Sequence, residues 1–168
     1  MKGGMNGKCE RPDHSEARRP WYAANPPEAI MYDSILVTLD ATPTDRAIID
    51  HVKLLAKRLG SRVTLLHVAD GWAARRFGPD AVSEEVDQDS VYLTEIRAEF
   101  EFEGIAARCE LAYGDPAGEI VKWVERNGCD LVAMSTHGHS GLADLLFGWT
   151  ASKVQHGISV PVLMLRAR

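Results

Sequence analysis

The sequence has few cysteines and no long apolar run. Its 168 residues hold three cysteines, Cys9, Cys109 and Cys129, and no two of them form a CxxC pair. This spacing argues against a disulfide scaffold and a zinc ribbon, and favours buried free thiols in a reducing compartment. No apolar run approaches the ~18 residues that a membrane span needs, and the N-terminus lacks the apolar core of a signal peptide. We therefore expect a cytoplasmic protein that does not bind membranes.

An excess of basic charge is also missing. Nineteen Lys and Arg residues against 24 Asp and Glu give a net charge of −5 at pH 7. A chain with this balance has no global basic field to attract nucleic acid or anionic lipid, so no nucleic-acid partner is expected. A phosphate ligand would have to be held by local geometry. The length fits a single domain.

The first 30 residues differ in composition from the rest. They hold four of the eight prolines and three glycines in the first seven positions, without hydrophobic periodicity. Such a segment buries too little apolar surface to offset the entropy of ordering it. We predict a largely disordered extension over residues 1–30 and one folded domain over residues 31–168.

From residue 31 onward, strand patterns alternate with helix patterns. Short apolar, β-rich runs predict five strands, at 34–39, 62–68, 105–113, 130–135 and from Ser159 to Leu165. Helices fill the intervals, and Thr44 or Asp45 is expected to cap the first, which Gly60 ends. The second, at about 82–103, is acidic with a buried stripe of Val86, Leu93, Ile96 and Phe100, and residues 71–81 before it are predicted to be a loop. The last helix is expected at about 149–156.

This order predicts an α/β fold, a single doubly wound, five-stranded parallel sheet with helices on both faces, as in Rossmann-like proteins. Such sheets bind ligands beyond the carboxyl ends of their strands, near the switch in strand order. The segments that leave the strands, at 38–40, 68–70, 113–115 and 134–139, are therefore where a site is expected.

A glycine-rich segment follows the fourth predicted strand. It reads STHGHSGLADLLFGWT from Ser135 to Thr150. Gly138 and Gly141 lie in a turn where the backbone must approach a ligand or adopt a positive φ. Gly148 precedes the last predicted helix, whose free N–H groups and dipole suit an anion. A glycine-rich connection without a ligand fits these residues equally well.

The motifs of dedicated enzymes are missing. The chain contains neither a GxxxxGK[ST] phosphate loop nor a GxSxG nucleophile elbow. The turn Asp40-Ala-Thr-Pro-Thr also lacks the Ser-Gly-Gly pattern of adenylating pyrophosphatases. We therefore assign no catalytic residue and do not expect an enzyme.

Histidines do not indicate a metal. His137 and His139 lie two residues apart, but no Cys or acidic residue adjacent in sequence completes a zinc site. No metal-binding residue is assigned. His51, near the expected inner face of the first helix, and His67, on a buried strand, are interpreted as core or boundary histidines.

The segment resembles the nucleotide-binding signature of the universal stress protein family, Gly-x2-Gly-x9-Gly-Ser/Thr. Here the spacing runs Ser135-x2-Gly138-x9-Gly148-Trp149. The resemblance spans nearly all of residues 31–168, and includes ILVTLD, LLHV, GDPAGEIV, DLVAMSTHGHSG and VPVLML. It implies a fold like that of the adenine nucleotide alpha hydrolases. It also implies a stress-response module that binds ATP or another adenine nucleotide, with Mg2+ as a candidate companion of the phosphates.

The resemblance implies which residues meet the adenosine part of the ligand. Adenine would lie against Thr38, Asp40 and Val68, and the Asp40 carboxylate would accept a hydrogen bond from adenine or ribose. Met134 and Ser135 correspond to positions beside the ribose and the first phosphate.

The phosphate site carried over from the family combines the loop and the helix start, at Gly138, His139, Gly148, Trp149 and Thr150. The chain departs from the signature at two positions. Ser135 replaces the first glycine and is small enough to be tolerated. Trp149 replaces the last hydroxyl residue, and its bulk would obstruct terminal phosphates.

Three functions fit these residues. The first is a homodimeric module that signals nucleotide occupancy, the second a slow ATPase or autophosphorylating enzyme, and the third an interaction protein that has lost its ligand. The resemblance implies pairing through the last strand, from Ser159 to Leu165, where Val160, Val162 and Met164 share one face. The same side chains also fit packing against the chain's own helices. The sequence names no signalling partner.

Overall fold

The computed structural model of the protein describes residues 31–80, 84–136 and 143–166, with the backbone alone at Pro79 and over 143–148. The predictions for residues 1–30 and for Gly138 and His139 lie outside the described residues. The strands are β1 (Ser34–Leu39), β2 (Arg62–Ala69), β3 (Ala107–Tyr113), β4 (Leu131–Thr136) and β5 (Val162–Arg166). The helices are α1 (Asp45–Leu59), α2 (Trp72–Phe77), α3 (Glu84–Phe102), α4 (Pro116–Asn127) and α5 (Ala143–Gly157), with a 3₁₀ turn, η2 (Gly78–Asp80), after α2.

The strands form one five-stranded sheet in the order β3-β2-β1-β4-β5, and every neighbouring pair is parallel. This confirms the predicted parallel α/β sheet. From β1 the chain winds outward to β2 and β3, then returns to the other side of β1 for β4 and β5. The switch in strand order therefore lies between β1 and β4, where sheets of this kind bind ligands.

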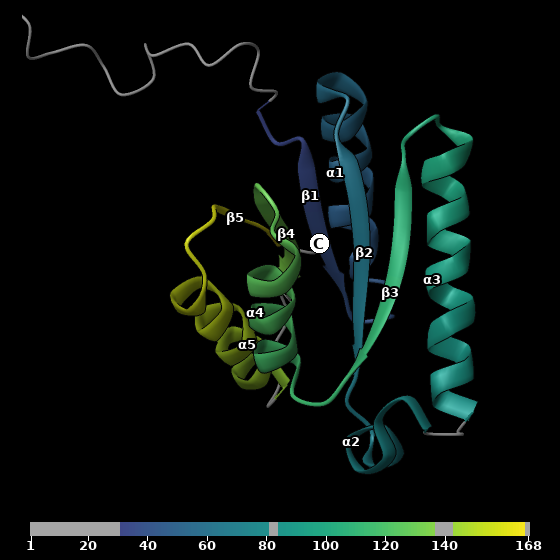
Figure 1. The fold of residues 1–168 in the computed structure, drawn as a ribbon, viewed down its shortest axis with the longest axis vertical. Helices are drawn as coiled ribbons and strands as arrows, with labels where there is room; N and C mark the ends of the chain where they lie inside the picture. The colour runs from purple at the N-terminus through teal and green to yellow at the C-terminus, as the bar shows by residue number, and fades with distance from the viewer. Residues whose placement is uncertain (1–30, 81–83, 137–142, 167–168) are drawn as a thin grey trace, which may run out of the picture.

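Helices cover both faces of the sheet, as predicted (Figure 1). α1 and α3 pack on one face, where they meet Ile35 and Val37 of β1. α4 and α5 pack on the other face, against Leu36 of β1 and Val132 of β4. Because successive side chains of a strand point to opposite faces and both faces are covered, the central strands β1 and β4 are mostly apolar and buried. Among the described residues, no helix has the length and apolarity to cross a membrane.

Local chemistry explains where two helices begin and end. α1 ends at Gly60, whose φ of 73° is the left-handed conformation that glycine adopts without a Cβ penalty. α4 begins after Asp115, which accepts a hydrogen bond from the Gly118 amide at 3.0 Å, and Pro116 occupies the first turn. The end of α1 at Gly60 was predicted from the sequence.

The prediction of a loop over residues 71–81 was wrong, because α2 and η2 lie there. A helix of six residues, as in α2, is too short to show a periodic apolar stripe. The later strands also begin after their predicted starts. β5 starts at Val162 rather than Ser159, since Pro161 has no N–H to donate to the ladder.

Two predictions on helices were also wrong. α5 begins at Ala143, not near Trp149, and Gly148 lies inside it. A helical glycine costs about 1 kcal/mol relative to alanine, which tertiary packing can override, and Ala151 and Val154 of α5 are buried. His51 is exposed on α1, where Val52 takes the buried position instead.

The buried stripe of α3 is confirmed and can be tested with two phenylalanines of that helix. Phe100 is fully buried against the sheet, whereas Phe102 is 92% exposed. We predict that Phe100→Ala lowers the free energy of unfolding by about 3–5 kcal/mol, since it leaves a cavity in the core. Phe102→Ala is the matched control and should change it by less than about 0.5 kcal/mol. Urea unfolding followed by circular dichroism measures both, and equal losses would contradict this packing of α3.

Candidate functional site

A hollow of about 140 Å³ opens at the carboxyl edge of the sheet, next to the switch in strand order. The structure brings together many of the predicted site residues here, namely Thr38, Asp40, Val68, Met134, Ser135 and Thr150. They come from the ends of β1, β2 and β4 and from α5. The hollow lies on the face that α4 and α5 cover, since Pro116 and Ile120 of α4 also line it.

Leu39 and Asp70 of this wall lie in strand exits where the sequence predicted a site, whereas the sequence analysis missed Leu66, His67, Pro116 and Ile120. The apolar members lie on a buried strand or an amphipathic helix, and their periodicity indicates only the core. Where an apolar residue borders a hollow depends on how two distant segments meet. The hydrophobic pattern of one segment therefore does not reveal which of its apolar residues border a hollow.

His67 is a buried structural histidine, as predicted. Its Nδ1 lies 2.9 Å from the carbonyl oxygen of Leu39, and its Nε2 lies 3.2 Å from Oδ2 of Asp89 on α3. These contacts join the ends of β1 and β2 to α3. The imidazole is therefore occupied by contacts that hold the fold together.

The predicted phosphate residues of the last helix lie differently from expectation. Because α5 begins at Ala143, the amides of Gly148, Trp149 and Thr150 lie inside a helix, where N–H groups bond to carbonyls four residues earlier. The side chain of Trp149 is 63% exposed, with the Lys153 ammonium 5.1 Å from its ring centroid. It is not among the described residues that line the hollow.

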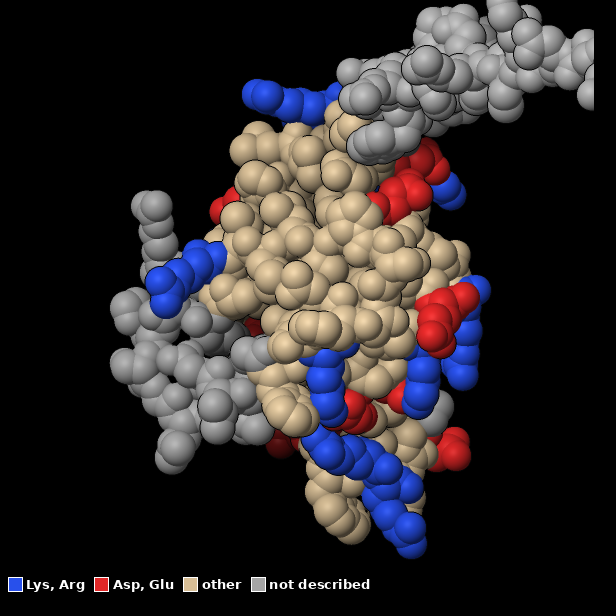
Figure 2. All heavy atoms as spheres, turned by 90° about the vertical axis from the view of Figure 1, so that its left-hand side faces the viewer, with Lys and Arg blue, Asp and Glu red and all other residues tan. Residues whose placement is uncertain are grey.

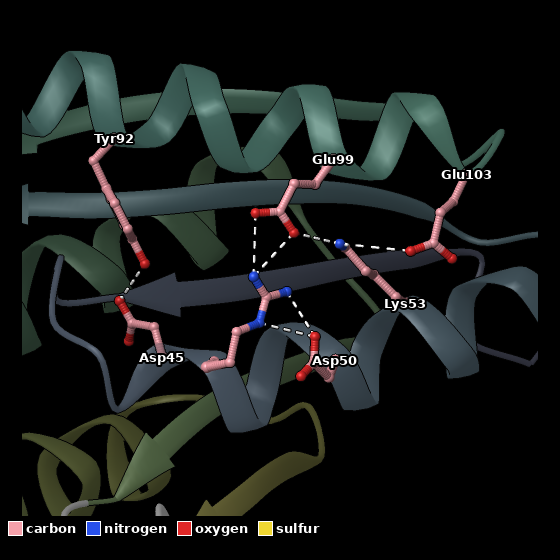
Figure 3. A network of polar contacts seen from close by, with 7 residues as sticks. Asp45, Asp50, Lys53, Tyr92, Glu99 and Glu103 are labelled. Atoms are coloured by element: carbon pink, nitrogen blue, oxygen red, sulfur yellow. Dashed lines mark hydrogen bonds and ion pairs between the residues drawn. The ribbon is translucent and has the colours of Figure 1, made fainter.

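A buried carboxylate lies directly behind Asp40. Asp45 is 1% exposed, and its Oδ2 accepts hydrogen bonds from the amides of Asp40 at 3.1 Å and Ala41 at 3.0 Å. The hydroxyl of Tyr92 on α3 donates to the same oxygen at 2.8 Å (Figure 3). The hydroxyl of Ser135 lies 3.4 Å from Oδ1. Asp45, the first residue of α1, thus links the end of β1 to α3 and β4. The sequence analysis considered this residue only as a candidate helix cap.

The electrostatics of this carboxylate follow from where it lies. Burial, and next the charge of Asp40, raise the pKa of Asp45 to about 7. Burial and the nearby Asp45 raise the pKa of Tyr92, so its phenol keeps its proton and acts as a donor. The donor groups around Asp45 suit an ionised carboxylate, while its burial opposes ionisation.

Ion pairs hold α1 against α3 beside this carboxylate (Figure 3). Glu99 of α3 accepts from Arg46 at 3.0 Å and from Lys53 at 2.5 Å, and Lys53 also lies 3.5 Å from Glu103. Burial opposes the ionisation of Glu99, but the hydrogen bonds from Lys53 and Arg46 lower its pKa below the ordinary value. The two helices are thereby fixed in the register that places Tyr92 on Asp45.

Comparison with known proteins gives the chain its family. Residues 31–166 match the universal stress protein family over almost the whole described domain. The chain belongs to the universal stress protein family. Universal stress protein MJ0577 of Methanocaldococcus jannaschii is 24% identical over 159 residues, which cover 83% of this chain and 98% of that protein. Universal stress protein YxiE of Bacillus subtilis is 26% identical over 148 residues, covering 81% and 100% of the two chains.

Solved structures of the family share the fold. The structure of MJ0577 superposes with a TM-score of 0.70 at 28% identity, covering 83% of this chain and 99% of that one. Universal stress protein UspA of Lactobacillus plantarum superposes with a TM-score of 0.68 at 21% identity, covering 80% and 98%. The universal stress fold thus accounts for the described part of the chain from β1 to β5.

The buried Asp45 makes stability depend on pH in a defined direction. Its pKa is about 7 in the folded protein against an ordinary 3.8, so the native state binds this proton more tightly than the unfolded chain. The stabilisation from the bound proton is therefore complete below pH 3.8 and lost as the pH rises to about 7. We predict that the free energy of unfolding of the wild type, relative to Asp45→Asn, falls across this interval.

Urea unfolding at a series of pH values measures this difference. Asp50→Asn is the matched control, because Asp50 lies on the same helix with its side chain 61% exposed. The control should keep the pH profile of the wild type. A free energy of unfolding of the wild type that rises with pH relative to that of Asp45→Asn would contradict the raised pKa.

Proposed function

We propose that the chain is a cytosolic stress-response module that binds an adenine nucleotide in the hollow at the ends of β1, β2 and β4. The observation that carries this proposal is the meeting of Thr38, Asp40, Val68, Met134 and Ser135 around one hollow at the switch in strand order. These are the residues that the family resemblance assigns to adenine and ribose. Their position around one hollow, although they come from three strands, supports the proposal.

Family relatives with adenine nucleotides support the choice of ligand. A universal stress protein solved in complex with cAMP superposes with a TM-score of 0.64 at 15% identity. One from Archaeoglobus fulgidus in complex with dAMP superposes with a TM-score of 0.60 at 17% identity. At such low identity the structural likeness shows a shared fold and nothing about the ligand. The ligand of this chain therefore has to be argued from its own residues.

The chemistry of the hollow suits a purine nucleoside. Leu66, Val68, Ile120 and Met134 provide apolar walls for a flat base. The carboxylate of Asp40 can accept a hydrogen bond from an exocyclic amine or a ribose hydroxyl. A ligand site of this kind needs apolar walls with a few well-placed polar groups.

The size of the hollow indicates which part of the ligand it takes. At about 140 Å³ it is smaller than the ~300–1,000 Å³ of pockets that enclose a whole drug-sized ligand. We infer that the base and part of the ribose enter it. The phosphates would then extend toward the connection between β4 and α5.

The corrected start of α5 moves the proposed phosphate contact. The unpaired N–H groups of a helix lie in its first turn, which here begins at Ala143 rather than at Trp149. The proposal therefore assigns the anion to this first turn and the glycine-containing connection before it. Mg2+ would accompany the phosphates as their counter-ion.

Isothermal titration with ATP, ADP, AMP and cyclic AMP tests the proposal. We predict that Asp40→Asn weakens the affinity of the wild type roughly tenfold, because a hydrogen bond to a charged acceptor is lost. Trp149→Ser is the control and should change ATP affinity by less than about twofold, since its exposed side chain makes no wall of the hollow. A wild type that binds none of the four below about 1 mM would contradict the proposed function.

We also propose that the chain forms a homodimer through β5. This strand pairs only with β4 in the described sheet, so its outer edge offers backbone groups to another strand. Val160 and Val162 pack partly against the chain's own α4–α5 cluster, whereas Met164 is 40% exposed. A two-fold contact that covers the edge and Met164 is the simplest closed arrangement.

A charge placed at this edge tests the dimer. We predict that Met164→Glu, which brings two like charges together across the two-fold axis, shifts the protein from dimer to monomer. Val91→Glu is the control, because Val91 is 58% exposed on α3 at the opposite side of the sheet. Light scattering after size exclusion measures the mass. A monomeric wild type, or a dimeric Met164→Glu, would contradict pairing through β5.

A further inference from the structure

The turn after β1 carries the carboxylate that faces the proposed ligand, and its backbone is held in an uncommon conformation. Ala41 has a φ of 59°, in the left-handed region that residues with a Cβ rarely adopt. Such a conformation persists only where surrounding contacts fix it. The amides of Asp40 and Ala41 both donate to one carboxylate oxygen of Asp45.

Asp45 is itself fixed from two sides. Tyr92 of α3 donates its hydroxyl to the same oxygen at 2.8 Å, and Ser135 of β4 lies 3.4 Å from the other oxygen. Ser135 also lines the hollow, as does Asp40. The buried carboxylate therefore connects the two strand ends between which the proposed nucleotide binds.

We propose that Asp45, supported by Tyr92, is a positioning residue of the nucleotide site, because its carboxylate fixes the turn that presents Asp40 to the ligand. This inference rests on the proposed function. Asp45 does not line the hollow and acts through the backbone of its neighbours. The amides of Asp40 and Ala41 and the Tyr92 hydroxyl donate to this carboxylate and favour its ionised form, whereas a side-chain hydrogen bond with Asp40 favours its protonated form.

Proton uptake by Asp45 should weaken this hold. The groups that face it are Asp40 from the β1 exit, Tyr92 from α3 and Ser135 from β4, while the neighbouring Arg46 bonds to acids further along α1 and α3. A hydrogen bond to a neutral acceptor is about half as strong as one to a charged acceptor. Because burial raises the pKa of Asp45 to about 7, the change falls within the physiological range.

The test compares Asp45→Asn with Asp50→Asn, which removes the same charge from an exposed position of the same helix. Titration with cyclic AMP is the probe, because its phosphodiester does not change charge near neutral pH. We expect Asp45→Asn to weaken binding roughly tenfold at pH 8, and Tyr92→Phe about threefold. Asp50→Asn should match the wild type.

The pH profile separates positioning from a merely structural role. Wild-type affinity should fall as the pH drops from about 8 to about 6, across the pKa of Asp45, while Asp45→Asn binds weakly with a flatter profile. Should Asp45→Asn fail to fold, Tyr92→Phe and the wild-type profile still decide the matter. If Asp45→Asn and Tyr92→Phe both bound cyclic AMP with the affinity and the pH profile of the wild type, the proposal would be overturned.

Amide hydrogen exchange at Asp40 and Ala41 keeps this inference distinct from the proposed function. We expect both amides to exchange roughly tenfold faster in Asp45→Asn than in the wild type or Asp50→Asn. Unchanged exchange would overturn the positioning role whatever the ligand. Faster exchange in a protein that binds no nucleotide would contradict the proposed function, and with it the link between the turn and a ligand.

Discussion

The parallel pairing of β1 with both β2 and β4 is the constraint on which the rest of the structure depends. β1 registers with β2 from Ser34 opposite Arg62 and with β4 from Ile35 opposite Leu131, so the carboxyl ends of the three strands reach one edge together. The order of the strands reverses across β1, which leaves the crevice beside its end open to a ligand. The apolar faces of the same strand anchor helices on both sides.

The buried carboxylate of Asp45 shows a conflict between stability and function. Its desolvation opposes the ionised form, yet the ionised form makes the stronger bonds to the turn before α1. Such conflicts are common at functional sites, where the surroundings of a titratable group often shift its pKa. The ion pairs between α1 and α3 join these two helices next to the buried carboxylate.

Residues whose role is set within one segment were predictable from the sequence. The apolar run of β1, the stripe of α3 that includes Phe100, and the end of α1 at Gly60 each follow from local pattern or glycine chemistry. α5 was different, because Gly148 indicates a helix boundary locally and is overridden by packing. The short α2 carries no periodicity from which it could be recognised.

The residues of the site also differ in whether the sequence could predict them. The ends of β1, β2 and β4 follow from the parallel topology, and the family signature indicates which of their residues meet a nucleotide. Asp45 could not be found in this way, since its significance depends on Tyr92, 47 residues away, and on a turn whose conformation no sequence pattern specifies. The direction in which the side chain of Trp149 points likewise depends on where α5 begins.

The central claim is that an adenine nucleotide enters the hollow at the carboxyl edge. Backbone amide shifts of the isotope-labelled protein, followed by NMR during titration with AMP, test it most directly. The account predicts that the largest changes fall at Asp40, Val68 and Ser135. Changes centred on the larger hollow of about 600 Å³ at the amino ends of the strands, beside Arg62 and Arg108, would contradict it.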